Sequence, residues 1–475
     1  ASSEWFLRTK MPDQTRKSRK LEEGLRLHQA GSLQKAKNIY TEVLAENPND
    51  PDAHHFIGLI AHQTGDFDEA VRMISRAVEL EEDRPTFYFN LGGAYLKMGQ
   101  RSNAIEAYKQ AVHLKPDWSE VHYNLGSLMG QAGPVKEAEA SLRRAIELNP
   151  KYPEALSSLG IVLNAQGKPE QAAKHCQQAV ELAPDLVEAW TNLGNALEKF
   201  GRYEEAESAH REAIGRNPDY VVGHYNLGNL MADFWRHDEA VQCFRNALEI
   251  SSQYFPAINN LLFNLLYDPN STETSLFDEH IEWASQCIVG KGDIVFNNNK
   301  NPDRRLRIGY VSSNFCTHSC AYFLEPLFSA HKPEQVEIFA YANVINPDEK
   351  TKSLKSLAHH WRDISALDEN DVCSAIQADQ IDVLVDLAGH SANNCLKIFR
   401  AKPAPIQVAW LGYPATTGMV EVDYRITDVI ADPLGEADQF HTETLIRLPD
   451  GFLCYAPALG GPGIEPPPSE SKGYV

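Results

Sequence analysis

Residues 85–118 read PTFYFNLGGAYLKMGQRSNAIEAYKQAVHLKPDW, and this stretch sets the pattern for the first half of the chain. Its first glycine, Gly92, belongs to a series in which a glycine returns every 34 residues. A second glycine, Gly99, and an alanine, Ala104, follow at fixed distances and also recur. A constant period predicts a row of similar structural units, each packed on its neighbours. The first glycines of the units are Gly24, Gly58, Gly92, Gly126, Gly160, Gly194 and Gly228.

A unit of this length with small residues at these places resembles the tetratricopeptide repeat, which is a pair of helices joined by a tight turn. Small residues let the two helices approach closely, and a closing proline such as Pro116 stops the second helix. Seven units over about 17–254 and a degenerate helix around 259–267 predict an α superhelix of repeats at 17–268, after a tail at 1–16. Stacked repeats of this class form a groove that binds other proteins.

An asparagine stands two residues before the first glycine in several units, so its side chain repeats on one helix face. Such amides can bond the backbone of an extended peptide through both their N–H and C=O groups. They can equally hold neighbouring helices together inside the array, and the spacing leaves both interpretations open. The candidate peptide-binding residues are Asn90, Asn124, Asn192, Asn226 and Asn260.

The repeat period ends near Tyr267, and a different alternation follows. A helix at about 270–290 and a polar loop predict a connecting segment over 269–303, after which residues 304–457 alternate short apolar runs with helical segments. This alternation predicts a Rossmann-like α/β lobe with a parallel, doubly wound sheet, followed by a Gly- and Pro-rich linker at 458–475. The expected strands are 306–311, 336–343, 381–387, 406–412 and 424–429, and the expected helices are 320–329 and 371–378.

Polar residues follow the predicted strands, and ligands of such sheets gather at the carboxyl ends of the strands. His318 follows the first strand, at or near the N-terminus of the next helix. The helix dipole there disfavours imidazolium and leaves a neutral ring that can accept a proton. The turns 389–394 and 411–418 follow the third and fourth strands. Asp386 ends the third strand, where an aspartate can contact a ligand or cap the turn after it.

The composition argues against several classes of function. The formal net charge of −21 leaves no basic surface overall, so we expect no nucleic-acid partner. No window approaches the roughly 18 to 20 apolar residues of a membrane helix, so we expect no membrane partner. Eight cysteines without a Cys-x-x-Cys pair favour the cytoplasm or, in a eukaryote, also the nucleus. Asp-x-Asp spacing occurs only in repeat turns, at Asp50/Asp52 and Asp66/Asp68, so it gives no metal site.

Two motifs of the second half, RIGYVSS at 307–313 and KPAPIQVAWLGYP at 402–414, occur together with the repeats. This combination resembles glycosyltransferase family 41, the O-GlcNAc transferases and their SPINDLY relatives, and further stretches are most similar to the SPINDLY branch. The resemblance implies a metal-independent, inverting enzyme without a cofactor that glycosylates Ser and Thr of intracellular proteins. The lobe would be the first half of a two-lobed GT-B region. The implied donor is UDP-GlcNAc, as in animal relatives, or GDP-fucose, as in plant SPINDLY.

The resemblance also implies roles for residues. It places His318 beside the reacting centre, as the base or as a donor that positions the sugar, and it places acceptor proteins in the groove of the repeats. Because Gly412 lies in a turn expected to face the donor, we expect Gly412→Val to clash with bound sugar nucleotide without unfolding the protein. The expected donor contacts are His390, Ser391, Leu411, Gly412 and Pro414.

The chain stops about where the second lobe of the family begins. We therefore expect these 475 residues to be a part of a longer enzyme. We expect this part alone not to transfer sugar. The competing interpretation is a non-catalytic adaptor, in which the repeats bind other proteins and the lobe has lost its donor site. A homodimer formed through the repeats is also compatible with the pattern.

Overall fold

The computed structural model of the protein describes residues 19–286, 296–301 and 303–455. The predicted tail at 1–16 and the predicted linker at 458–475 lie outside these residues, as does part of the connecting segment. The chain divides into two compact units, Ala1–Asn226 and Leu227–Val475. None of the helices in the described ranges is long and apolar enough to cross a membrane.

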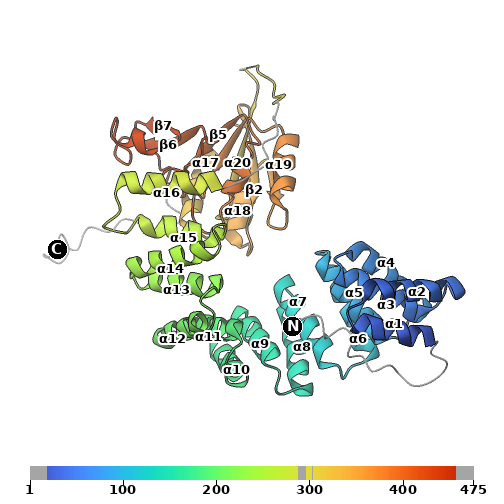
Figure 1. Cartoon of the computed structure of the whole chain (residues 1–475). Coiled ribbons are helices and arrows are strands. Elements are labelled where there is room, and N and C mark those ends of the chain that lie inside the picture. Colours follow the sequence, from blue (N-terminus) through green and yellow to red (C-terminus); the bar gives the residue numbers. More distant parts are fainter. Residues whose placement is uncertain (1–18, 287–295, 302, 456–475) are drawn as a thin grey trace. The chain divides into compact units, whose positions relative to one another are not determined.

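The first unit holds a helix pair for each of the first six repeats of the sequence (Figure 1). Within each pair the helices pack against each other, as the tetratricopeptide pattern predicts. The pairs are α1 (Arg19–Gln29) with α2 (Leu33–Glu46), α3 (Pro51–Gln63) with α4 (Phe67–Leu80), α5 (Pro85–Lys97) with α6 (Arg101–Leu114), α7 (Ser119–Ala132) with α8 (Val135–Leu148), α9 (Pro153–Ala165) with α10 (Pro169–Leu182), and α11 (Val187–Phe200) with α12 (Tyr203–Arg216).

The two glycines of each repeat do different things. Gly92 has no room for a side chain, because a Cβ there would lie 2.7 Å from the ring of Tyr108 on the second helix. Gly99 lies in the turn with a φ of +72°, a left-handed conformation that glycine adopts without strain. The first glycine therefore sets the distance between the helices, and the second makes the turn.

The last helices of the array belong to the second unit. Helix α13 (Val221–Asp233) spans the boundary, and α14 (His237–Ile250), α15 (Phe255–Leu265) and α16 (Glu273–Gln286) follow it. Trp235 replaces the turn glycine of the seventh repeat, keeps a positive φ of +59° and is 75% exposed. The degenerate helix and the connecting helix predicted from the sequence are therefore both present.

The rest of the second unit is a lobe built on a parallel sheet with helices (Figure 1). The seven strands of the sheet lie in the order β3-β2-β1-β4-β5-β6-β7. All five predicted strands are present, and two further strands, β3 and β7, lie at the edges. The strands are β1 (Leu306–Ser312), β2 (Val336–Ala342), β3 (His360–Asp363), β4 (Val383–Asp386), β5 (Ile406–Ala409), β6 (Tyr424–Asp428) and β7 (Thr444–Leu448). The helices are α17 (Ser319–Ala330), α18 (Glu349–Leu357), α19 (Glu369–Ala378) and α20 (Leu396–Arg400), with a short 3-10 helix at Ala437–Phe440.

Two apolar cores lie against the sheet. One joins Trp283 of α16 and Leu262 of α15 to sheet residues such as Tyr341, so the last helices of the array and the lobe share a core. The other joins Phe315 and Leu324 with strand residues of β1 and β2. The shared core fixes α15 and α16 on the lobe, because burial of such side chains stabilises by about 1.5–3 kcal/mol each.

Candidate functional site

Three turns meet at the carboxyl edge of the sheet, after β1, β4 and β5. Val311 pairs with Asp386 and Asp386 pairs with Ala409, so the three strands end side by side. The Ser313 hydroxyl donates to the carbonyl of Ala392 at 3.3 Å, which ties the first turn to the second. The turns that follow these strands thus form one continuous surface at the position where sheets of this kind bind ligands.

The second and third turns approach each other closely at two glycines, where there is no room for a side chain. A Cβ at Gly412 would lie 2.1 Å from the carbonyl oxygen of Leu387, and a Cβ at Gly389 would lie 2.2 Å from Cβ of Tyr413. The expectation that Gly412→Val would disturb only a bound ligand is therefore wrong. The new side chain would first collide with the backbone of the neighbouring turn.

His318 is the N-cap of α17. Its Nδ1 accepts a hydrogen bond from the backbone N–H of Cys320 at 3.2 Å, while the side chain stays partly exposed to solvent. Partial burial lowers the pKa of His318, so the ring is neutral at pH 7. Because Nδ1 is the acceptor, this hydrogen-bond pattern assigns the single ring proton to Nε2. In this arrangement His318 offers a hydrogen-bond donor at its free edge.

Asp348 holds the turn that carries His318. One carboxylate oxygen accepts the N–H of Thr317 at 2.7 Å, and the other accepts the N–H of Thr351 at 2.9 Å as the cap of α18. Hydrogen bonds from Thr317 and Thr351 lower the pKa of Asp348. Sequence analysis missed this residue, although Asp348 and Thr351 have the spacing of a capping box.

His390 lies inside the lobe, with 1% of its surface exposed. Its Nε2 is 3.1 Å from the carbonyl oxygen of Thr417, and its ring packs edge-on against Trp283 with centroids 4.4 Å apart. Burial lowers the pKa of His390 well below its ordinary value, so the ring is neutral. The neighbouring ring of His280 bonds the Tyr413 hydroxyl at 2.8 Å. These rings join α16 to the second and third turns.

The other expected donor contacts are closer to solvent. Pro414 is exposed, and Leu411 and Gly412 are half-buried. Leu411 has a φ of +77°, which is a strained conformation for a branched residue. The hydroxyl of Ser391 is buried and has no hydrogen-bond partner among the described residues. The surface of the three turns therefore presents Pro414 and Leu411, while His390 supports it from beneath.

Asp386 caps its own turn. Its carboxylate accepts the N–H groups of Ala388 at 3.2 Å and Gly389 at 2.7 Å, and only 1% of the residue is exposed. Burial raises the pKa of Asp386 to about 6, against the lowering effect of those two hydrogen bonds. Of the two roles that the sequence left open, the structure shows the capping one.

Glu443 anchors the third turn and was missed by sequence analysis. Its carboxylate accepts the Thr416 hydroxyl at 2.6 Å and the Thr417 N–H at 2.7 Å, and it is 4% exposed. A buried carboxylate with several donors is a strong local constraint. No sequence signal links Glu443 to a turn that precedes it by 26 residues, because only the parallel strands bring them together.

The asparagine series makes hydrogen bonds between neighbouring repeats. Asn90 is 3% exposed and its Nδ2 lies 2.8 Å from Nε2 of His55. Asn192 donates to the Ser157 hydroxyl at 2.9 Å and remains half-buried. The last two bonds run from Asn226 to Asn195 at 3.1 Å and from Asn260 to Asn229 at 2.6 Å. These amides therefore link neighbouring repeats, and Asn192 and Asn226 are half-buried, so part of each side chain reaches solvent.

Asn124 differs from the other members of the series. It is half-buried, and it makes no inter-repeat hydrogen bond within the described part of the chain. Among the described residues there is also no group of three or more His, Cys, Asp or Glu side chains placed to hold a metal ion.

Comparison with known proteins gives two family matches. Residues 279–456 match the family described as Glycosyl transferase family 41. Residues 14–257 match the family described as Cilia and flagella-associated protein 70 C-terminal domain, which is a match within the repeats. The first match covers the end of α16 and the lobe, and the second covers the repeats.

Relatives and a solved structure match in the same way. The probable UDP-N-acetylglucosamine–peptide N-acetylglucosaminyltransferase SPINDLY of Solanum lycopersicum is 39% identical over 233 residues, 48% of this chain and 25% of the relative. The UDP-N-acetylglucosamine–peptide N-acetylglucosaminyltransferase of Caenorhabditis elegans is 38% identical over 152 residues, 32% of this chain and 13% of the relative. A mutant of the Thermobaculum terrenum O-GlcNAc transferase superposes with a TM-score of 0.60 and 32% identity, over 66% of this chain and 60% of that one.

A repeat array that shares a core with a parallel α/β lobe, whose carboxyl-edge turns carry the matched motifs, defines a protein of the glycosyltransferase class. Residues 279–456, which hold the lobe, match glycosyltransferase family 41, and the chain is similar to O-GlcNAc transferases and SPINDLY-like proteins. The matched residues cover only 25% of the length of the SPINDLY relative from Solanum lycopersicum.

Proposed function

We propose that this chain provides the acceptor-binding repeats and one sugar-nucleotide-binding lobe of a protein O-glycosyltransferase. The donor is UDP-GlcNAc or GDP-fucose, and the acceptors are Ser and Thr hydroxyls of proteins held by the repeats. The proposal rests on one observation. Three turns that lie within the match to family 41 come together at the carboxyl edge of the sheet. The names of the relatives favour UDP-N-acetylglucosamine as the donor.

In this proposal His318 orients the reacting groups. The Cys320 N–H occupies Nδ1 of His318, so Nε2–H is the group available to a substrate oxygen. A hydrogen-bond donor at that place can orient the sugar nucleotide or the acceptor hydroxyl for the reaction. Positioning of this kind raises the rate without any proton transfer. The exposed Pro414 and the half-buried Leu411 supply apolar surface on the third turn.

The repeats hold the acceptor chain through amides that are not sequence-selective. The half-buried Asn124, Asn192 and Asn226 can bond peptide backbone groups, each contributing about 0.5–1.5 kcal/mol. We place the protein in the cytoplasm or nucleus. This proposal is supported by the seven cysteines of the described ranges, which are all free, as expected in a reducing compartment.

Transfer assays with the full protein that the gene encodes test the proposal. The protein is incubated in parallel with UDP-GlcNAc and GDP-fucose, each labelled in the sugar, and with a lysate of its own cells as the acceptor source. We expect one donor to label proteins and the other to give background only. Failure of both donors, with a folded protein, would contradict the proposal and favour the adaptor interpretation.

A further inference from the structure

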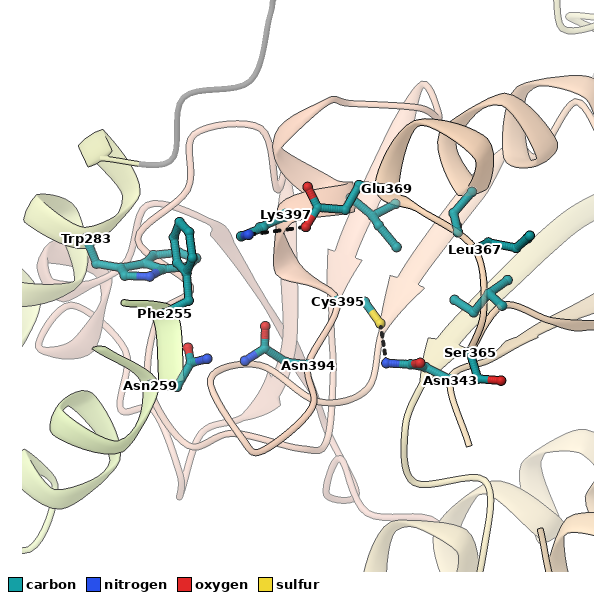
Figure 2. A pocket seen from close by; sticks show the side chains of 13 residues that line it. Phe255, Asn259, Trp283, Asn343, Ser365, Leu367, Glu369, Asn394, Cys395 and Lys397 are labelled. Carbon is teal, nitrogen blue, oxygen red and sulfur yellow. Dashed lines mark hydrogen bonds and ion pairs between the residues drawn. The ribbon is translucent and has the colours of Figure 1, made fainter. Parts of the chain in front are cut away.

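A pocket of about 260 Å³ lies between the last helices of the array and the lobe, and Asn394, at the end of the second turn, lines part of it (Figure 2). Phe255, Asn259 and Trp283 line one side of it. Leu367 and Lys397 are among the residues on the lobe side. All of these residues belong to the second unit, and the shared core beneath them fixes the two sides of the pocket.

Two buried polar atoms of this pocket lack partners. Trp283 is 4% exposed, and its Nε1–H has no hydrogen-bond partner among the described residues. The Oδ1 atom of Asn259 is buried without a partner in the same described part of the chain. A buried polar group left unpaired costs about 1–3 kcal/mol. The pocket therefore offers one free donor and one free acceptor, which a matching ligand would satisfy.

The rest of the lining mixes apolar side chains with polar ones, among them Asn343, Ser365 and Asn394. Ile364, Val372 and Ile398 contribute aliphatic surface. Lys397 places its ammonium 3.8 Å from the centre of the Phe255 ring and 3.2 Å from a carboxylate oxygen of Glu369. These contacts hold the aromatic wall in place and neutralise the local charges, so the pocket has no free charge to attract an ion.

We propose that this pocket binds a secondary amide that carries a small apolar group. The amide C=O accepts from Trp283 Nε1–H, the amide N–H donates to Asn259 Oδ1, and the apolar group fills the aliphatic part. A leucine-like residue of a peptide and an acetamido sugar both present this chemistry. The inference does not rest on the proposed transfer reaction, because none of the residues that bind the amide belongs to the three turns.

Competing ligand classes fit less well. A charged ligand would lose its hydration and find the Lys397 and Glu369 charges already paired. A purely apolar ligand would fill the space but leave the Trp283 and Asn259 atoms unpaired. The secondary amide is the simplest group that supplies one acceptor and one donor next to apolar surface.

Indole N–H resonances measured by NMR on the 475-residue chain test the proposal. The chain has seven tryptophans, and the Trp283 signal is assigned by its absence in Trp283→Phe. The probes are N-acetyl-leucine methylamide, free N-acetylglucosamine and isoamyl alcohol, which lacks an amide. We expect a saturable shift of the Trp283 signal with one of the two amides, with a dissociation constant near the millimolar range of a small ligand. The amide that shifts it identifies the source.

Three variants separate binding in the pocket from binding elsewhere. Ser365→Trp places a large side chain at the exposed mouth and should abolish the shift. Asn259→Leu keeps the size but removes the acceptor and should weaken binding by about three- to tenfold, the loss of one hydrogen bond. Asn270→Leu changes an exposed amide outside the pocket and should change nothing. No shift with either amide, an equal shift with isoamyl alcohol, or full binding by Ser365→Trp would each overturn the proposal.

Discussion

One ring nitrogen of His318 already makes a hydrogen bond to the backbone of the protein. Nδ1 caps α17 by accepting the Cys320 N–H, so a change at this residue affects both helix capping and whatever Nε2 contacts. The two effects can be separated, because asparagine is also a good N-cap but is too short to replace the imidazole Nε2. Matched substitutions can therefore distinguish a cap from a substrate-positioning group.

We predict that His318→Ala lowers both stability and turnover, while His318→Asn restores stability only. Loss of an N-cap costs about 0.5–2 kcal/mol, and asparagine should recover most of it. Turnover of both variants should fall by at least about tenfold if Nε2–H holds a substrate oxygen in the transition state, as loss of about 1.4 kcal/mol implies. Thermal unfolding and the transfer assay are measured on the same proteins. Normal turnover of the His318→Asn variant would show that His318 only caps the helix and does not position a substrate.

We predict that a substitution at Gly412 changes the stability of the lobe, rather than only the binding of a ligand. Because its Cβ would lie 2.1 Å from the Leu387 oxygen, Gly412→Ala should destabilise the lobe by about 1–3 kcal/mol, the usual cost of overpacking. Gly215→Ala is the control, since a Cβ at Gly215, in α12, meets nothing within 4 Å. Denaturant unfolding without any donor present measures both changes. Equal stability of the two variants would show that the second and third turns do not interlock as described.

At the scale of the helix pair, one contact is repeated with different residues. The first glycine of each repeat faces a side chain 16 residues later, on the second helix of the pair. Aromatic, aliphatic and sulfur side chains fill this place in most repeats, and a histidine fills it once. The facing residues are Tyr40, Ile74, Tyr108, Leu142, Cys176, His210 and Phe244. His210 is the exception in chemistry, because both of its ring nitrogens are buried without a partner in the described structure.

We predict that His210→Phe stabilises the repeats, and more so in acid. Burial lowers the pKa of His210 to about 4 from about 6.5, so the unfolded chain takes up the proton first. The natural protein therefore loses stability as the pH falls from about 6.5 to about 4, by about 2 kcal/mol at pH 5. Phenylalanine, which the next repeat uses at Phe244, removes this loss. Denaturant unfolding at pH 8 and pH 5 should show the larger gain at pH 5, and equal gains would contradict the buried, neutral histidine.

The elements that sequence analysis found are those with a strong local pattern. The repeat helices follow from a period of glycines, and the central strands β1, β2 and β4 follow from short apolar runs buried on both faces. The edge strand β3 was missed because most of its four residues are exposed, so no apolar run marks it. The other edge strand, β7, alternates exposed and half-buried residues and was missed for the same reason.

The candidate site was predictable in its place but not in its contacts. Parallel strands end at one edge, so the turns after β1, β4 and β5 could be placed together from their order alone. The burial of His390 depends on Trp283, more than 100 residues earlier in the chain, and the support from Glu443 comes from the residue before β7. Such pairs carry no local signal, because they exist only once the chain has folded.

Across the whole molecule, the amide series runs through both units. The inter-repeat bonds of Asn192 and Asn226 lie in the first unit, and that of Asn260 lies in the second. Part of the series is therefore structural, and a multiple alanine variant would mix lost affinity with lost stability. Asn124, which lacks an inter-repeat bond among the described residues, and Ser157, the partner of Asn192, allow the two contributions to be measured separately.

We predict that Asn124→Ala weakens acceptor binding without changing stability, and that Ser157→Ala does the reverse. Loss of one peptide hydrogen bond at Asn124 should weaken binding of an acceptor protein identified in the transfer assay by about two- to tenfold. Ser157→Ala removes the partner of Asn192 and should cost about 0.5–1.5 kcal/mol of stability. The Asn192 amide itself stays available to the acceptor in that variant, so affinity should be kept. Calorimetric binding and thermal unfolding on the same samples measure both. Unchanged affinity in Asn124→Ala together with weaker binding in Ser157→Ala would mean that the amides act by holding the repeats in register rather than by touching the acceptor.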